Sequence, residues 1–195
     1  QAAMSAAGTG DIIQLGNGTF TGPGNRNLNT NETSFSLVSQ SGNPALCVID
    51  CQGSAATPYY GIAYSTQGTE TVLRGITIRK AYASISGGAL NLANAGITVE
   101  NCIFADNIAW NYGGAIFADD WSNPVIRNCK FSGNSAAYYG QGGALYFDQN
   151  SSPVIEGCTF WNNTADQGGA AYFVDGSPSI TQSTFFNNLP GVFYL

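Results

Sequence analysis

The 195-residue chain contains no histidine. Catalysis by a Ser–His–Asp triad, acid–base chemistry at an imidazole and metal binding by histidine are therefore excluded. Basic residues are also scarce: there are six, against twelve acidic residues, which gives a formal net charge of −6 and a pI near 4.2. Because phosphate backbones repel such a chain, the sequence predicts no nucleic-acid partner.

Charged residues make up only 9% of the chain, whereas globular domains typically contain about 25%. Lysine, arginine, glutamate and leucine are few, which argues against an α-rich fold. No apolar run reaches the roughly 18 residues that a membrane-spanning helix requires, so we predict no membrane insertion. Hydrophobic residues still form 44% of the chain, enough for the core of a single domain over residues 1–195.

Cysteine occurs at an odd number of positions, and no Cys-x-x-Cys pair typical of zinc sites is present. At least one thiol must therefore lie outside any intrachain disulfide. Cys47 and Cys51 can form a disulfide only if the chain bends between them, because in a straight strand their Cα atoms would be about 13 Å apart. The sequence leaves both alternatives open.

Two short motifs recur together along the second half of the chain. Gly-Gly-Ala occurs at residues 87–89, 113–115, 142–144 and 168–170. A second motif, Cys or Ser followed by x-Phe-x-x-Asn, occurs at residues 102–107, 129–134, 158–163 and 183–188. The segments around these motifs alternate apolar and polar residues, which is typical of strands, and are separated by proline-containing turns. The Gly-Gly-Ala motifs are spaced by 26, 29 and 26 residues, and repetition at such a period indicates a solenoid.

The period leaves room for two or three strands in each repeat and none for a helix. We therefore predict an all-β fold, a right-handed parallel β-helix of about six or seven coils. Equivalent residues would then form ladders along the axis, with small inward residues in one and mutually bonded amides in another. The predicted cysteine ladder contains Cys102, Cys129 and Cys158, and the predicted asparagine ladder contains Asn107, Asn134, Asn163 and Asn188. A β-propeller is the alternative, although each of its blades usually needs roughly 40 residues.

The chain divides into three parts on this interpretation. Residues 1–86 form irregular amino-terminal coils, residues 87–190 form regular coils, and residues 191–195 begin a further coil that has no cap. Residues 1–7 are the candidate for a short helix that covers the open end of the core. Residues 21–33, which are rich in glycine and asparagine, are expected to leave the coil as an excursion.

The paired motifs resemble the repeats of the polymorphic outer membrane proteins, which are surface adhesins with β-helical passenger domains. This resemblance covers residues 87–188. The opening segment, with Gly10-Asp-Ile-Ile-Gln-Leu15 and Gly18-Thr-Phe20, looks like the first coil of secreted pectin-lyase-like β-helix proteins. The two resemblances imply a surface or secreted β-helix. They do not imply one activity, because this fold hosts lyases, hydrolases, adhesins and phage tailspikes.

Acidic residues follow the Gly-Gly-Ala strands at near-equivalent positions: Asp119, Asp120, Asp148 and Asp175. Stacked carboxylates about 5 Å apart repel one another unless a cation lies between them, so these four are the candidate metal ligands. Aspartate is equally typical of exposed turns, and Arg127 and Lys130 belong to a different strand of the coil. We therefore predict no catalytic residue, no metal and no cofactor.

The outward positions of the Gly-Gly-Ala strands begin with Asn91 and continue with aromatic residues only. These are Phe117, Tyr146, Tyr172 and Tyr194. Consecutive rings on an outer sheet face predict a contact surface for a protein or for the faces of sugar rings. The alternatives are that a loop or glycan covers the rings, or that aromatic residues simply suit strands.

Four asparagines lie in Asn-x-Ser/Thr sequons and are glycosylation candidates: Asn17, Asn31, Asn150 and Asn162. Together with the low lysine content, they favour an extracellular or cell-surface location. The sequence thus predicts a non-enzymatic structural or adhesive module that binds itself, another surface protein or a glycan. Its uncapped end favours a head-to-tail fibre. The alternative is a polysaccharide-binding or polysaccharide-processing, lyase-like protein.

Overall fold

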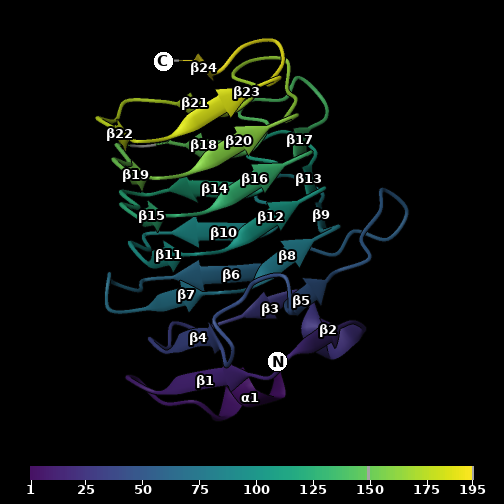
Figure 1. Ribbon diagram of the computed structural model, residues 1–195, viewed down its shortest axis with the longest axis vertical. Coiled ribbons are helices and arrows are strands. Elements are labelled where there is room, and N and C mark those ends of the chain that lie inside the picture. Colours follow the sequence, from purple (N-terminus) through teal and green to yellow (C-terminus); the bar gives the residue numbers. More distant parts are fainter. Residues whose placement is uncertain (149, 195) are drawn as a thin grey trace.

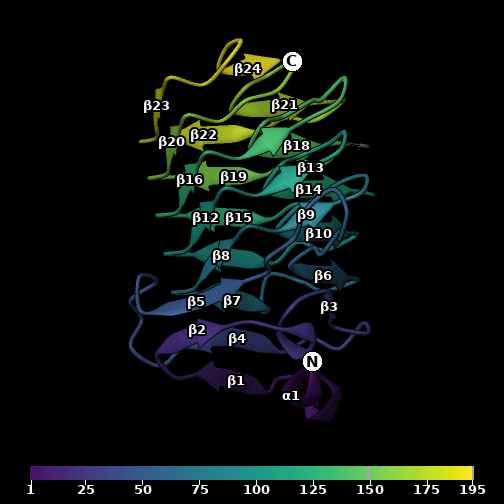
Figure 2. The same ribbon diagram turned by 90° about the vertical axis from the view of Figure 1, so that its right-hand side faces the viewer.

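A computed structural model describes residues 1–148 and 150–194, which form one stack of parallel β-coils (Figure 1). Three sheets run along the stack, and each of them has seven strands. The prediction of an all-β parallel β-helix with six or seven coils is confirmed. The two chain ends lie at opposite ends of the stack (Figure 2).

Each coil passes through the three sheets in the order A, B, C. Sheet A contains β1 (Ile12–Leu15), β4 (Ser36–Ser39), β7 (Val72–Arg74), β11 (Thr98–Glu100), β15 (Val125–Arg127), β19 (Val154–Glu156) and β22 (Ser179–Thr181). Sheet B contains β2 (Gly18–Phe20), β5 (Cys47–Asp50), β8 (Thr77–Arg79), β12 (Ile103–Ala105), β16 (Lys130–Ser132), β20 (Thr159–Trp161) and β23 (Thr184–Phe186). Sheet C contains β3 (Leu28–Asn29), β6 (Ile62–Ser65), β10 (Leu90–Ala93), β14 (Ile116–Asp119), β18 (Leu145–Phe147), β21 (Ala171–Phe173) and β24 (Phe193–Tyr194). A short sheet D, made of β9 (Tyr82–Ala83), β13 (Ile108–Ala109) and β17 (Ser135–Ala136), lies between B and C in the middle coils.

The amino-terminal end of the core is closed by helix α1 (Ala2–Ala6), as predicted for residues 1–7. Its buried residue, Met4, packs into the apolar core. The segment 21–33 is only partly the predicted excursion. It contains the short 3₁₀ helix η1 (Pro23–Asn25) and then β3, which pairs with β6 and therefore belongs to sheet C. The expectation missed β3 because a two-residue strand carries almost no alternating pattern.

The carboxy-terminal end of the described chain is β24, which pairs with β21 as expected for a further coil. Phe193 occupies the inward column, where its ring contacts those of Phe173 and Phe185, and Tyr194 occupies the outward column. Residue 195, which was included in the predicted coil, lies outside the described residues.

The inward faces of the strands form continuous columns of like side chains. In sheet B, Phe104, Phe131, Phe160 and Phe185 stack with ring centroids 4.6–5.0 Å apart. The predicted cysteine ladder is confirmed, because Cys102, Cys129 and Cys158 are buried in a neighbouring column that continues to Ser183. The register also places Cys47 in this column, one coil before Ile76. Cys47 and Cys51 are both free thiols, so the sequence alternative without a disulfide is the one observed.

The predicted asparagine ladder is also confirmed. Asn107 Nδ2 donates to Asn134 Oδ1 at 3.0 Å, and the pattern repeats from Asn134 to Asn163 and from Asn163 to Asn188. Each Nδ2 also donates to a backbone carbonyl of the preceding coil, for example to Ile78 O at 3.0 Å. The ladder therefore satisfies buried donors and acceptors where the chain leaves sheet B, a bend at which regular pairing is interrupted.

Both glycines of the Gly-Gly-Ala motif are required for steric reasons. The first glycine, as in Gly113, has φ near +59°, a left-handed conformation that glycine adopts without strain. At the second, Gly114, an added Cβ would overlap the carbonyl oxygen of Gly143 one coil further on. Coils can therefore approach closely here only without side chains. A similar left-handed corner at Gly75 separates β7 from β8.

Candidate functional site

The predicted aromatic column exists on the outer face of sheet C. The register places Asn91, Phe117, Tyr146, Tyr172 and Tyr194 on successive coils. Phe117, Tyr146 and Tyr172 stack in turn with centroid separations of 5.5 and 5.3 Å, and Tyr172 stacks on Tyr194 at 4.6 Å. The column was predictable because the Gly-Gly-Ala motif fixes the register of each strand.

The column is not equally open along its length. Tyr146 is only 5% exposed, whereas Tyr194 is 45% exposed. Tyr112 accounts for part of the cover over Tyr146, since its ring lies 4.8 Å from that of Tyr146 and 6.3 Å from that of Phe117. Tyr146 is therefore a packed residue at the centre of the column, and at this position the alternative that a loop covers the ring applies.

A second group of rings, at the corner between sheets B and C, was largely missed from the sequence. Trp110 stacks on Tyr138 at 5.2 Å, and the rings of Tyr138 and Tyr139 meet edge to face at 4.6 Å. All three are exposed, by 41%, 50% and 75% respectively. Trp110 precedes Tyr112 by two residues, so this group continues toward the sheet C column. Tyr138 and Tyr139 lie in the loop 135–141, which is two residues longer than the equivalent loop 108–112 and three residues longer than 164–167, so they gave no repeat signal.

We call these two groups together the aromatic face: Trp110, Tyr112, Phe117, Tyr138, Tyr139, Tyr146, Tyr172 and Tyr194. A groove of about 360 Å³ lies beside it, lined by Asn27, Pro58, Tyr60, Tyr82, Ala83, Ser84, Ile85, Ser86 and Asn91. Backbone hydrogen bonds connect the two regions, from Trp110 N to Ala83 O at 3.0 Å and from Asn111 N to Ile85 O at 2.8 Å. None of the described residues that line the groove carries a charge. Amides, hydroxyls and apolar groups are what it offers to a ligand.

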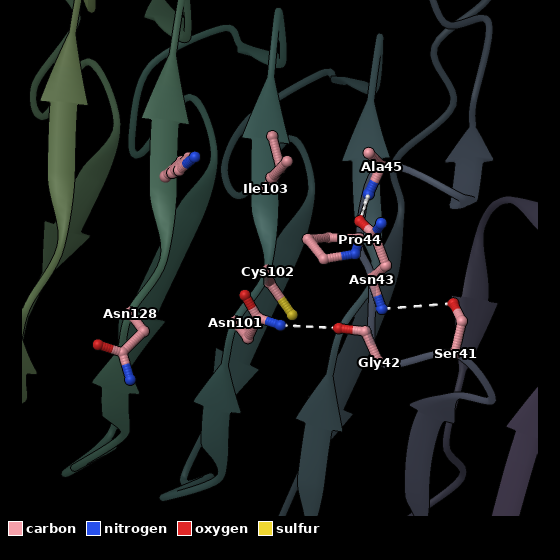
Figure 3. A pocket seen from close by; sticks show the side chains of 10 residues that line it. Ser41, Gly42, Asn43, Pro44, Ala45, Asn101, Cys102, Ile103 and Asn128 are labelled. Carbon is pink, nitrogen blue, oxygen red and sulfur yellow. Dashed lines mark hydrogen bonds between the residues drawn. The ribbon is translucent and has the colours of Figure 1, made fainter.

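A larger groove, of about 420 Å³, lies at the corner between sheets A and B (Figure 3). The loop 41–45 forms one wall, and the corner residues Asn101 and Asn128 with Lys130 form the other. The loop is held in place because Asn101 Nδ2 donates to Gly42 O at 2.8 Å and Thr77 Oγ1 donates to Pro44 O at 2.7 Å. This loop connects β4 to β5 and lies against the corner at which sheet A meets sheet B.

The four acidic residues that follow the Gly-Gly-Ala strands, which we call the acidic turn, lie in two columns. Asp119 and Asp148 follow paired residues of β14 and β18 and lie on adjacent coils. Asp120 and Asp175 are corner residues with left-handed φ near +52°. Burial, reinforced by the charges of Asp120 and Asp148, raises the pKa of Asp119 to about 6. One carboxylate oxygen of Asp119 is buried without a hydrogen-bond partner among the described residues.

No group of three or more acidic or cysteine side chains in residues 1–148 and 150–194 is arranged to hold a metal ion. Arg127 is paired with Glu156 at 3.1 Å on sheet A, and Lys130 lines the groove of Figure 3. The acidic turn and these two bases thus belong to different parts of the coil. Burial raises the pKa of Cys51 to about 12 and that of Cys129 strongly, whereas hydrogen bonding with Cys129 lowers the pKa of Cys158. All five thiols are buried, so none of them is presented to a substrate.

The four sequon asparagines, Asn17, Asn31, Asn150 and Asn162, are all exposed. Asn162 points outward while its neighbour Asn163 is buried in the ladder, as the repeat predicts. Their exposure makes them accessible for modification, and glycosylation itself stays a prediction.

A family model described as "Right handed beta helix region" matches residues 36–195. No curated protein and no solved structure matches the chain. No helix in the described part of the chain is long and apolar enough to cross a membrane.

Proposed function

Because the chain belongs to the right-handed β-helix family, we propose that it is a non-catalytic adhesive module that presents the aromatic face to a neutral glycan. The coils supply a rigid scaffold, on which the register fixes the spacing between rings. The module acts at the cell surface or outside the cell, as the exposed sequons and the resemblance to polymorphic outer membrane protein repeats favour.

The observation that carries the proposal is the exposed stack of Trp110 and Tyr138, next to the uncharged groove. Tryptophan and tyrosine combine a large apolar ring with a polar tip, which suits surfaces that are wet when free and covered when bound. The C–H groups on the face of a pyranose pack on such rings, while its hydroxyls bond to amides. Asn91, Ser84 and Ser86 line the groove and provide such partners. An acidic glycan would be repelled by the net charge of −6.

Affinity electrophoresis in gels that contain soluble β-glucan, xylan or mannan tests the proposal. We expect at least one of these neutral polysaccharides to retard the protein, and Trp110→Ala to abolish the retardation. Trp161→Ala is the matched control, because Trp161 stacks on Phe186 on the outer face of sheet B. Two outcomes would contradict a glycan-binding role for the aromatic face. One is equal retardation of Trp110→Ala and Trp161→Ala, and the other is a wild-type protein that no gel retards.

The alternative of a lyase-like enzyme is tested with the same protein on uronic-acid polysaccharides such as pectate and alginate, because β-elimination requires a carboxylate next to the proton that is removed. A lyase releases unsaturated sugars that absorb in the ultraviolet, and Asp119 and Asp148 lie at equivalent positions on adjacent coils. Release of such products by the wild type, lost in Asp148→Asn, would replace the adhesive function with a catalytic one.

Head-to-tail assembly is a second candidate function, favoured by the sheet topology. Within residues 1–148 and 150–194, each long sheet ends at a strand that pairs along one edge only, and Phe193 in β24 is 40% exposed. Either later residues of a longer chain or a second copy can pair with that edge. Phe193→Pro removes a backbone donor there and should abolish any fibres seen by electron microscopy. Fibres formed equally by this variant would contradict strand pairing at β24.

A further inference from the structure

The outer face of sheet A carries charges of alternating sign. Successive coils place Arg74, Glu100, Arg127 and Glu156 in one column, in direct register. Arg127 and Glu156 approach to 3.1 Å and Arg74 and Glu100 to 4.0 Å, with side chains that are 39–53% exposed. These four residues, the charge ladder, are electrically neutral as a group although the chain carries −6.

A second outward column lies two residues earlier in each of these strands. It contains Val72, Thr98, Val125 and Val154, again in register. Val154 is 36% exposed, and the other three are partly exposed. Sheet A therefore shows the solvent a narrow strip of β-branched side chains beside the charge ladder.

From this arrangement we propose that sheet A is a dimer surface and that its partner is a second copy of this chain, related by a two-fold axis parallel to the strands. The order Arg, Glu, Arg, Glu becomes Glu, Arg, Glu, Arg when it is reversed. Two copies placed face to face in opposite directions thus bring every charge opposite its complement. A copy placed in the same direction would bring any facing charges together as like pairs, which repel.

The same axis also matches the β-branched column. Reversal puts Val72 opposite Val154 of the second copy and Thr98 opposite Val125, so apolar groups meet apolar groups. A two-fold contact of this kind is isologous: each surface is complementary to itself. The charge pattern and the apolar pattern favour the same axis, although they come from different positions of the strands.

The contact is expected to be weak. With parallel strands about 4.8 Å apart, the charge ladder spans only about 14 Å along the stack. Standard interfaces bury roughly 800 Å² on each partner, which is more than this strip offers, and exposed ion pairs are screened by salt. Association should therefore appear at high protein concentration and low ionic strength.

Charge reversal provides a specific test by sedimentation velocity between about 10 μM and 1 mM. Glu100→Arg alone creates the order Arg, Arg, Arg, Glu, and Arg127→Glu alone creates Arg, Glu, Glu, Glu. Each variant faces like charges at its centre when paired with itself, so each is expected to stay monomeric. An equal mixture of the two variants is complementary at all four positions, and we expect it to recover the wild-type dimer.

Two controls accompany this test. Circular dichroism and thermal unfolding establish that both variants keep the fold, which the exposure of the two side chains allows. Tyr172→Ser alters the aromatic face on sheet C and should leave the dimer intact, which separates this inference from the proposed function. The inference is overturned if the wild type is monomeric at 1 mM, if either charge variant dimerises like the wild type, or if the mixture stays monomeric. Loss of the dimer in Tyr172→Ser with no loss in the charge variants would move the contact to sheet C and also overturn it.

Discussion

Asn134 Oδ1 accepts two hydrogen bonds from Asn107 of the preceding coil, one from the backbone nitrogen at 3.1 Å and one from Nδ2 at 3.0 Å. Both residues are fully buried. A single amide oxygen therefore satisfies two donors that water cannot reach. At this bend the side-chain amide replaces a backbone acceptor for Asn107 N–H, while the carbonyl of Asn107 still accepts from Ser135 N at 2.9 Å.

Replacement of Asn134 by alanine should be strongly destabilising. It leaves the backbone N–H and one of the two Nδ2 hydrogens of Asn107 without an acceptor, and it removes the Nδ2 that donates to Phe104 O. Each orphaned buried group costs about 1–3 kcal/mol, so we expect a loss of about 3 kcal/mol or more in the free energy of unfolding, measured by urea denaturation. The exposed Thr184→Ala should change it by less than about 0.5 kcal/mol. Similar values for the two variants would contradict the structural role of the ladder.

Gly114 should tolerate no side chain at all. A Cβ at this position would meet the carbonyl oxygen of Gly143 and would lie 2.6 Å from Ser135 O, and both are backbone atoms that cannot rotate away. We expect Gly114→Ala to lower the free energy of unfolding by about 3 kcal/mol or to prevent folding, because overpacking forces the coils apart. Gly24→Ala is the control, since nothing lies within 4 Å of the position that its Cβ would take. A thermal midpoint for Gly114→Ala equal to that of Gly24→Ala would show that the coils separate easily.

The steric role of Gly114 also explains why the regular half of the fold was predictable. Each Gly-Gly-Ala sets the register of one sheet C strand, and each x-Phe-x-x-Asn sets one sheet B strand and the following bend. The aromatic column followed directly from these positions. Residues 21–33 have neither motif, so β3 was missed. Tyr138 and Tyr139 lie in an insertion, and their proximity to Trp110 depends on stacking between coils that no local pattern encodes.

Asp119 should make the protein less stable as the pH rises. Burial, followed by the neighbouring charges of Asp120 and Asp148, raises its pKa to about 6, whereas an unfolded aspartate has a pKa of about 3.9. The folded state therefore binds the proton more tightly, and the resulting stabilisation is present below about pH 4 and disappears as the pH rises through about 6. Asp119→Asn should raise the thermal midpoint at pH 7 and flatten its change between pH 5 and 7. Asp175 is exposed, so Asp175→Asn removes one negative charge but no buried carboxylate. The thermal midpoint of this variant should change between pH 5 and 7 as it does in the wild type. A wild-type pH profile in Asp119→Asn would contradict this assignment.

The last prediction concerns the five thiols, which are all free and all buried. Thiolate is the reactive form, and burial opposes it by raising the pKa of Cys51 to about 12 and that of Cys129 well above its usual range. The hydrogen bond with Cys129 lowers the pKa of Cys158 instead, but this side chain is buried, so a reagent reaches it only if the coils open. Cys102 Sγ lies within 3.3 Å of Glu100 O, so these thiols act as small donors to the backbone. A disulfide reagent such as dithionitrobenzoate should therefore react slowly with the native protein at pH 8 and should titrate all five thiols once urea unfolds the chain.

Cys129→Ser is the matched variant, because Ser183 already occupies this column in a later coil and donates to Thr181 O at 2.9 Å. It should fold, release one equivalent fewer in urea and remain as unreactive as the wild type when native. Rapid reaction of even one thiol in the native protein would show that the cysteine column opens to solvent, and would reopen a chemical role for it.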